Sequence, residues 1–204
     1  MTDTNGTAPL VAGLLLAAGG GRRLGGRPKA LLPHHGRPLV EHAVRALRDG
    51  GCGTVHIVLG AAAREVRERA ALEGCVLLDN PDWAEGMGGS LRLGLGSLAA
   101  TGAEAALVSL VDQPGVGAEA VARVRAAYRS PGSLAAAAYG GRRGHPVLVG
   151  AGHWAGVAAG AAGDQGARTY LREHADALAL VECGDIADPG DIDTPEDLSR
   201  LGGP

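Results

Sequence analysis

A glycine-rich segment near the N-terminus carries residue types that could bind a triphosphate. The apolar run 11–18 ends in Gly19-Gly20-Gly21, and Arg22, Arg23 and Lys29 follow it. Glycines directly after a strand let backbone N–H groups approach a phosphate closely. Lys29 is the single lysine among 19 basic residues, which indicates that this position needs a compact ammonium group. We therefore predict a triphosphate-binding loop here.

Two common nucleotide-binding patterns do not fit this loop. The dinucleotide fingerprint G-x-G-x-x-G needs a third glycine where Leu24 stands, and no acidic residue closes the second apolar run, which ends at Leu59. The Walker pattern fails because Pro28 precedes Lys29 and Ala30 follows it. A glycine-rich turn with solvated arginines is the structural alternative to a phosphate site.

Aspartates in two later segments could hold a divalent cation. Asp112 closes the apolar run 105–111, where a carboxylate gains nothing from packing. Mg²⁺ binds few protein oxygens and takes its other ligands from phosphates and water. Asp191 and Asp193 lie in a segment that is also a good helix start, with Thr194 as cap and Pro195 in the first turn. The residues alone leave both readings of that segment open.

Apolar runs and helical periodicities alternate along the chain and define the elements that must position these residues. Predicted strands cover 11–18, 55–59, 75–78, 105–111, 134–139, 146–149 and 179–181. Predicted helices cover 38–48, 62–71, 90–98, 118–128, 165–174 and 195–201.

This alternation predicts an α/β fold: a single Rossmann-like, three-layer domain over 10–202 with a mostly parallel central sheet. The hairpin-like piece near 134–149 breaks the alternation, and we expect 1–9 to be disordered. Ligands of open parallel sheets bind at the carboxyl ends of the strands, where the candidate residues fall.

Composition excludes several classes of function. The 204 residues are 46% hydrophobic and 20% charged, which is ordinary for a globular protein. A net charge of -3 argues against nonspecific binding to nucleic acid or to a membrane surface. No apolar run approaches the ~20 residues of a membrane span, and no basic flank of a signal peptide precedes residue 10. Three separated cysteines match no disulfide or zinc pattern, so we expect a cytoplasmic protein.

Six segments, in order, resemble the MobA-like nucleotidyltransferases. The segments are LAAGGGRRLGGRPKALLP at 16–33, NPDWAEGMGGSLR at 80–92, VDQP at 111–114, GHPVL at 144–148, GDQGAR at 163–168 and DIDTPEDL at 191–198. The resemblance implies a fold of the nucleotide-diphospho-sugar transferase type.

Within that family the set is most similar to CTP:molybdopterin cytidylyltransferases, since Ala18 stands where guanylyl-specific relatives have glycine. The resemblance implies Mg²⁺-dependent transfer of CMP from CTP to the phosphate of molybdenum-molybdopterin, with release of pyrophosphate. A molybdoenzyme or its chaperone could be a further partner. The alternatives are another NTP such as GTP, or another phosphorylated acceptor. A nucleotide-dependent oxidoreductase and a non-catalytic pterin-binding protein are less favoured.

The resemblance also implies roles for individual residues. Arg23, Lys29 and Asp112 are the expected catalytic residues, and the metal ligands are Asp112 and Asp193, with Asp191 as the alternative to Asp193. The expected nucleotide-binding set is Leu16, Ala17, Ala18, Gly19, Gly20, Gly21, Arg22, Arg23, Lys29, Gly88 and Ser90. The expected acceptor-binding set is Gln113, His145, Asp164 and Arg168. A helix cap for Ser90 and an ordinary structural role for His145 stay open.

Overall fold

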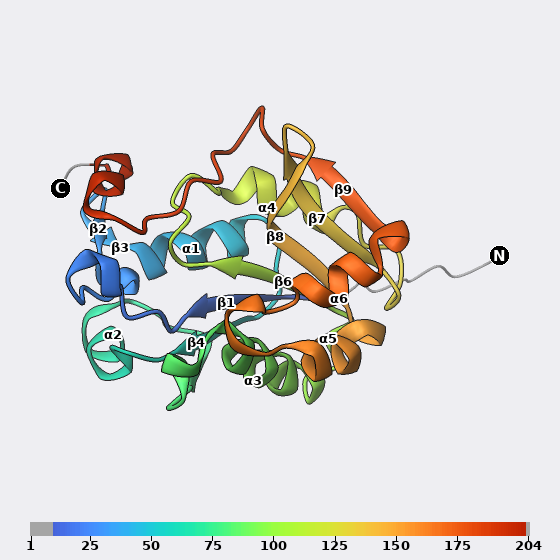
Figure 1. Ribbon diagram of the computed structural model, residues 1–204, viewed down its shortest axis with the longest axis horizontal. Coiled ribbons are helices and arrows are strands. Elements are labelled where there is room, and N and C mark those ends of the chain that lie inside the picture. The colour runs from blue at the N-terminus through green and yellow to red at the C-terminus, as the bar shows by residue number, and fades with distance from the viewer. Residues whose placement is uncertain (1–9, 203–204) are drawn as a thin grey trace.

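A seven-stranded sheet runs through the middle of the molecule (Figure 1). The computed structural model describes residues 10–202, so the expectation for 1–9 lies outside the described residues. The strand order is β5-β4-β1-β6-β8-β7-β9. The strands are β1 (Val11–Ala17), β4 (Val55–Leu59), β5 (Cys75–Asp79), β6 (Ala105–Leu110), β7 (Leu134–Tyr139), β8 (Arg142–Gly150) and β9 (Leu178–Glu182). Only β8 runs antiparallel to its neighbours, β6 and β7. The predicted α/β class with a mostly parallel sheet is confirmed.

Helices cover both faces of the sheet, which gives three layers (Figure 1). On one face lie α1 (Leu39–Asp49), α2 (Ala63–Arg69) and α4 (Ala118–Arg125), and on the other lie α3 (Met87–Ala99), α5 (Trp154–Gly160) and α6 (Arg168–Glu173). Side chains of β1 alternate between the two layers: Leu15 packs in the core of α1 and α4, whereas Leu14 packs in the core of α3 and α5. Because both faces of β1 are buried, its sequence is continuously apolar.

The short elements differ from the prediction in ways that follow from packing. Helix α3 begins at Met87, three residues before the predicted start, and the predicted C-terminal helix is a 3₁₀ helix, Pro195–Arg200. Helix α5 was not predicted, because its sequence WAGVAAG has no polar face; burial of Trp154 and Val157 stabilises it instead. Strands β2 (Pro33–His34) and β3 (Arg37–Pro38) form a small separate hairpin.

The remaining 3₁₀ turns are Arg22–Leu24, Lys29–Leu31, Trp83–Glu85, Ala151–His153, Gly163–Gln165 and Ala175–Ala177. Among the described residues, no helix combines the length and the apolar character needed to cross a membrane.

Candidate active site

Two adjoining cavities open where β1 and β6 end. The first has a volume of about 700 Å³ and is lined by the glycine loop, by basic side chains and by four aspartates. The second, of about 530 Å³, lies toward β8 and α6. Leu16, Met87, Leu110, Arg168 and Asp191 line both cavities. The site therefore has room for two ligands in contact with each other.

The glycine loop is folded so tightly that side chains would not fit at Gly20 and Gly21. Gly21 has a φ of 59° and accepts hydrogen bonds from the N–H groups of Leu24 at 2.8 Å and Gly26 at 3.0 Å. A Cβ at Gly21 would overlap the carbonyl oxygen of Arg27, and one at Gly20 would lie 2.8 Å from the ring of Trp83. The turn thus presents bare backbone to the first cavity, as phosphate binding requires.

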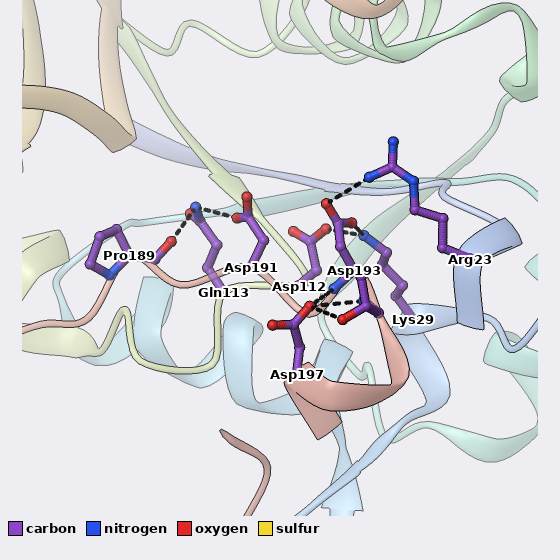
Figure 2. Close-up of polar contacts among 9 residues, drawn as sticks. Arg23, Lys29, Asp112, Gln113, Pro189, Asp191, Asp193 and Asp197 are labelled. Atoms are coloured by element: carbon purple, nitrogen blue, oxygen red, sulfur yellow. Dashed lines mark hydrogen bonds and ion pairs between the residues drawn. The ribbon is translucent and has the colours of Figure 1, made fainter. Parts of the chain in front are cut away.

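Lys29 joins two aspartates across the floor of the first cavity (Figure 2). Its Nζ donates hydrogen bonds to Asp112 Oδ2 at 2.6 Å and to Asp193 Oδ1. Burial alone would lower the pKa of Lys29, but the charge of Asp112 and the hydrogen bonds to both carboxylates outweigh burial and raise the pKa above its ordinary value. Lys29 is therefore a fixed ammonium group. Arg23 Nη1 lies 3.8 Å from Asp193 Oδ2 on a side chain that is 77% exposed, so this ion pair is weak.

Buried Ile192 brings the C-terminal segment to the site. Its side chain is fully buried, and its N–H donates to the carbonyl oxygen of Asp112 at 2.9 Å. The carboxylate of Asp197 accepts hydrogen bonds from Asp193 N at 3.1 Å and from Thr194 N at 2.8 Å. The predicted helix start at Thr194 is therefore confirmed, and it does not compete with a site role. The same turn holds the Asp193 side chain against Lys29.

Gln113 holds the neighbouring Asp191 in place (Figure 2). Its Nε2 donates to Asp191 Oδ1 at 2.7 Å and to the carbonyl oxygen of Pro189 at 3.2 Å. Burial, followed by the negative charge of Asp112, raises the pKa of Asp191. Asp191 thus adds a third carboxylate beside Asp112 and Asp193, and a bound cation would favour the ionised form of all three.

The second cavity is rich in arginine. Arg142, Arg143 and Arg168 line it together with His145. Burial, with smaller effects of the Arg168 and Arg143 charges, lowers the pKa of His145 to about 4. His145 is thus neutral near pH 7, and the positive charge of the cavity comes from the arginines. Anionic groups are the ligands that such a cavity favours.

Comparison with known proteins identifies the family. Residues 13–178 match the model of the MobA-like NTP transferase domain. The chain belongs to this family. The resemblance seen in the sequence motifs is therefore confirmed, and the chain is a MobA-like nucleotidyltransferase by family.

Individual relatives of this MobA-like domain carry different names. The chain is 45% identical to nicotine blue oxidoreductase of Paenarthrobacter nicotinovorans, over 98% of this chain and 100% of that protein. It is 34% identical to a molybdenum cofactor guanylyltransferase of Acidiphilium cryptum, over 73% of this chain and 70% of that protein. Its structure resembles that of Rv0371c in complex with manganese from Mycobacterium tuberculosis, with a TM-score of 0.75, 26% identity and coverage of 94% and 97% of the two chains. Membership of the MobA-like family thus assigns neither the nucleotide nor the acceptor.

The aspartates of this MobA-like domain fit a divalent cation. Asp112 and Asp193 are close enough to share one ammonium group, and carboxylate oxygens are the ligands that Mg²⁺ and Mn²⁺ favour. In residues 10–202 no group of three or more His, Cys, Asp or Glu side chains is arranged to hold a metal ion. An ion held by Asp112 and Asp193 would therefore need phosphate and water oxygens as its other ligands.

The structure brings most of the predicted site residues to the two cavities. The first cavity is lined by Leu16, Ala18, Gly19, Gly20, Gly21, Arg22, Arg23, Lys29, Ser90, Asp112, Asp164, Arg168, Asp191 and Asp193. Gln113 and His145 line only the second cavity. Ala17 and Gly88 line neither: Ala17 packs in the core, and Gly88 lets α3 lie against the backbone of Ala161.

Trp83, Arg142 and Arg143 line the cavities without having been predicted. The adjacent arginines between Gly141 and Gly144, at the start of β8, were a usable signal, because paired guanidinium groups are suited to binding anions. Trp83 gave no such signal, since a single tryptophan is as common in a core as at a site.

We predict that His145→Gln makes the protein less sensitive to acid. The folded-state pKa of about 4 lies below the ordinary 6.5, so between these values the unfolded chain binds more protons than the folded chain. Stability is therefore lost as the pH falls from 6.5 toward 4. Between pH 7 and pH 5 the free energy of unfolding, measured with urea, should fall by about 1–2 kcal/mol less in the variant than in the natural protein. An equal loss in the two proteins would contradict the prediction.

Proposed function

We propose that this protein transfers CMP from CTP to the phosphate of molybdenum-bound molybdopterin and releases pyrophosphate. The adjoining cavities are the observation that carries the proposal. One combines a glycine loop, Lys29 and aspartates, the other is lined by arginines, and they meet at Arg168 and Asp191. The similarity to a molybdenum cofactor guanylyltransferase supports the acceptor, and Ala18 at the wall of the first cavity supports CTP.

The chemistry requires two anions to approach each other. An oxygen of the acceptor phosphate forms a bond to the α-phosphorus of CTP, and the bond to the β-phosphate breaks so that pyrophosphate leaves with the electron pair. The backbone of Gly19–Gly21 holds the phosphates, and the fixed charge of Lys29 offsets the charge that develops on the leaving group. Mg²⁺ held by Asp112 and Asp193 would neutralise further phosphate charge.

Arginines of the second cavity orient the acceptor. Arg142 and Arg143 begin β8, and Arg168 begins α6. Planar guanidinium groups bind phosphate through two parallel hydrogen bonds, which fixes the direction of the attacking oxygen. Neutral His145 beside them can donate or accept a hydrogen bond with the pterin.

Base preference tests this proposal directly. We predict that, with molybdopterin and Mg²⁺, CTP gives a kcat/KM at least about tenfold above that of GTP, UTP or ATP, because the wall of the cavity discriminates between bases. The measurement is pyrophosphate release with each nucleotide, and omission of the pterin is the control. Equal use of the four nucleotides would contradict the choice of CTP.

An oxidoreductase is the second candidate, and the full-length similarity to nicotine blue oxidoreductase favours it. The loop lacks the dinucleotide fingerprint, which counts against a nicotinamide cofactor bound in that way. Fluorescence titration with NADH and NADPH separates the two candidates. Tight binding of either coenzyme, together with coenzyme-dependent reduction of a dye and no turnover of CTP, would replace the proposed transferase by a reductase.

A further inference from the structure

Asn80 is a buried amide whose orientation is fixed by its neighbours. It follows β5 and is 6% exposed, and its backbone N–H donates to the carbonyl oxygen of Leu59 at 2.8 Å. The side-chain Oδ1 accepts a hydrogen bond from the N–H of Asp82 at 3.1 Å. A backbone N–H can only donate, so Oδ1 must face Asp82 and the NH₂ group must face the other way.

The NH₂ group of Asn80 points at Ser90. Nδ2 donates to Ser90 Oγ at 3.0 Å, and Ser90 is itself 3% exposed on the first turn of α3. A hydroxyl has one hydrogen to donate and two lone pairs. Asn80 occupies one lone pair, and within residues 10–202 no side chain or backbone group accepts a hydrogen bond from the hydroxyl. The O–H of Ser90 is therefore the group left for a ligand.

Ser90 lines the first cavity, whereas Asn80 does not. The pair thus consists of a group at the wall and a support behind it. Asn80 instead lines a separate, smaller cavity. A role of Asn80 toward a ligand of the first cavity must therefore act through Ser90.

We propose that Asn80 is a positioning residue that makes the Ser90 hydroxyl a hydrogen-bond donor to the nucleobase, and that it thereby contributes to the choice of base. This inference rests on the proposed function, because it places a nucleotide in the first cavity. Cytosine accepts a hydrogen bond at N3, where uracil carries an N–H donor, whereas O2 is an acceptor in both bases. A donor fixed at the cavity wall that faces N3 therefore suits cytosine better than uracil, since a donor that faces another donor loses its partner.

A double-mutant cycle tests the inference. Asn80→Ala and Ser90→Ala should each raise the KM for CTP about tenfold with a smaller change in kcat. The double variant should be no worse than either single variant, because Asn80 acts only through Ser90. Asp82→Ala is the matched control, since it alters an exposed side chain on the same turn and retains the N–H that Asn80 accepts.

Asn80→Asp gives a sharper result. A carboxylate only accepts hydrogen bonds, so the Ser90 hydroxyl would turn to donate to residue 80 and would present a lone pair to the cavity. The ratio of CTP to UTP in kcat/KM should fall in this variant by more than it falls in Asn80→Ala. Calorimetric binding of CTP and UTP without acceptor, with thermal unfolding of each variant, shows that the change lies in base recognition and not in folding.

The outcomes separate this inference from the proposed function. If the natural protein transfers no CMP and binds no CTP, the proposed function fails. If it uses CTP but the effects of Asn80→Ala and Ser90→Ala multiply in the double variant, the positioning role is wrong. The role is equally wrong if Asn80→Asp changes the use of CTP and UTP by the same factor.

Discussion

Lys29→Ala should lower kcat/KM for nucleotidyl transfer by about 10²–10³-fold, the scale expected when one preorganised charge is removed from a reaction between anions. Its ammonium group lies 2.6 Å from Asp112 Oδ2 and also contacts Asp193. Its loss removes a positive charge that would face the phosphates, and it leaves the two carboxylates facing each other without a cation between them. The measurement is steady-state pyrophosphate release at saturating Mg²⁺.

Two further variants make the effect of Lys29 specific. Arg27→Ala removes the same unit of charge from an exposed side chain of the same loop that does not line the first cavity, and its rate should stay within about twofold, as for an ordinary surface change. Lys29→Arg keeps the charge but changes its shape, so its rate should lie between the natural protein and Lys29→Ala. A fully active, folded Lys29→Ala would show that the glycine loop is not the phosphate site.

The central part of the fold could be predicted because its signals are local. Continuous apolar runs such as 11–18 specify buried parallel strands, and the stop at Gly19 marks where the ligand side of the sheet begins. The order of the strands was not predicted, although parallel strands joined by helices have few topologies. Helix α5 was not predicted, because its sequence carries no local signal. Burial of Trp154 and Val157 in the core stabilises it instead.

The site could be predicted residue by residue but not as a set of contacts. Lys29 and Asp193 are 164 positions apart, and the sequence around either residue does not indicate that their side chains form a contact. Their contact depends on the long return of the chain from β9 and on the buried anchor at Ile192 (Figure 1). The orientation of Asn80 is likewise set by Asp82 and Ser90 together, and such an arrangement is visible only in three dimensions.

Asp112→Asn should abolish metal-dependent turnover almost completely, with a fall in kcat of about 10²–10³-fold. Asn has nearly the same shape and can still accept a hydrogen bond from Lys29, so the fold should be retained. It lacks the negative charge that a divalent cation needs from its few protein ligands. The concentration of Mg²⁺ or Mn²⁺ that gives half of the remaining rate should rise as well, and titration of activity with each metal measures it.

Asp191→Asn is the informative comparison, because Asp191 already accepts a hydrogen bond from Gln113 at 2.7 Å, whereas Asp112 faces the ammonium group of Lys29. We expect the change at Asp191 to cost less in kcat than the change at Asp112. The Kd of Asp112→Asn for molybdopterin should stay within about twofold of that of the natural protein, since the arginine-lined cavity is untouched. The change in the protein's tryptophan fluorescence on binding measures this Kd. If this variant bound the pterin normally and the natural protein also showed no turnover that depends on a metal, the protein would be a carrier of the pterin. A metal-dependent rate that disappears with the charge of Asp112 is what a transferase requires.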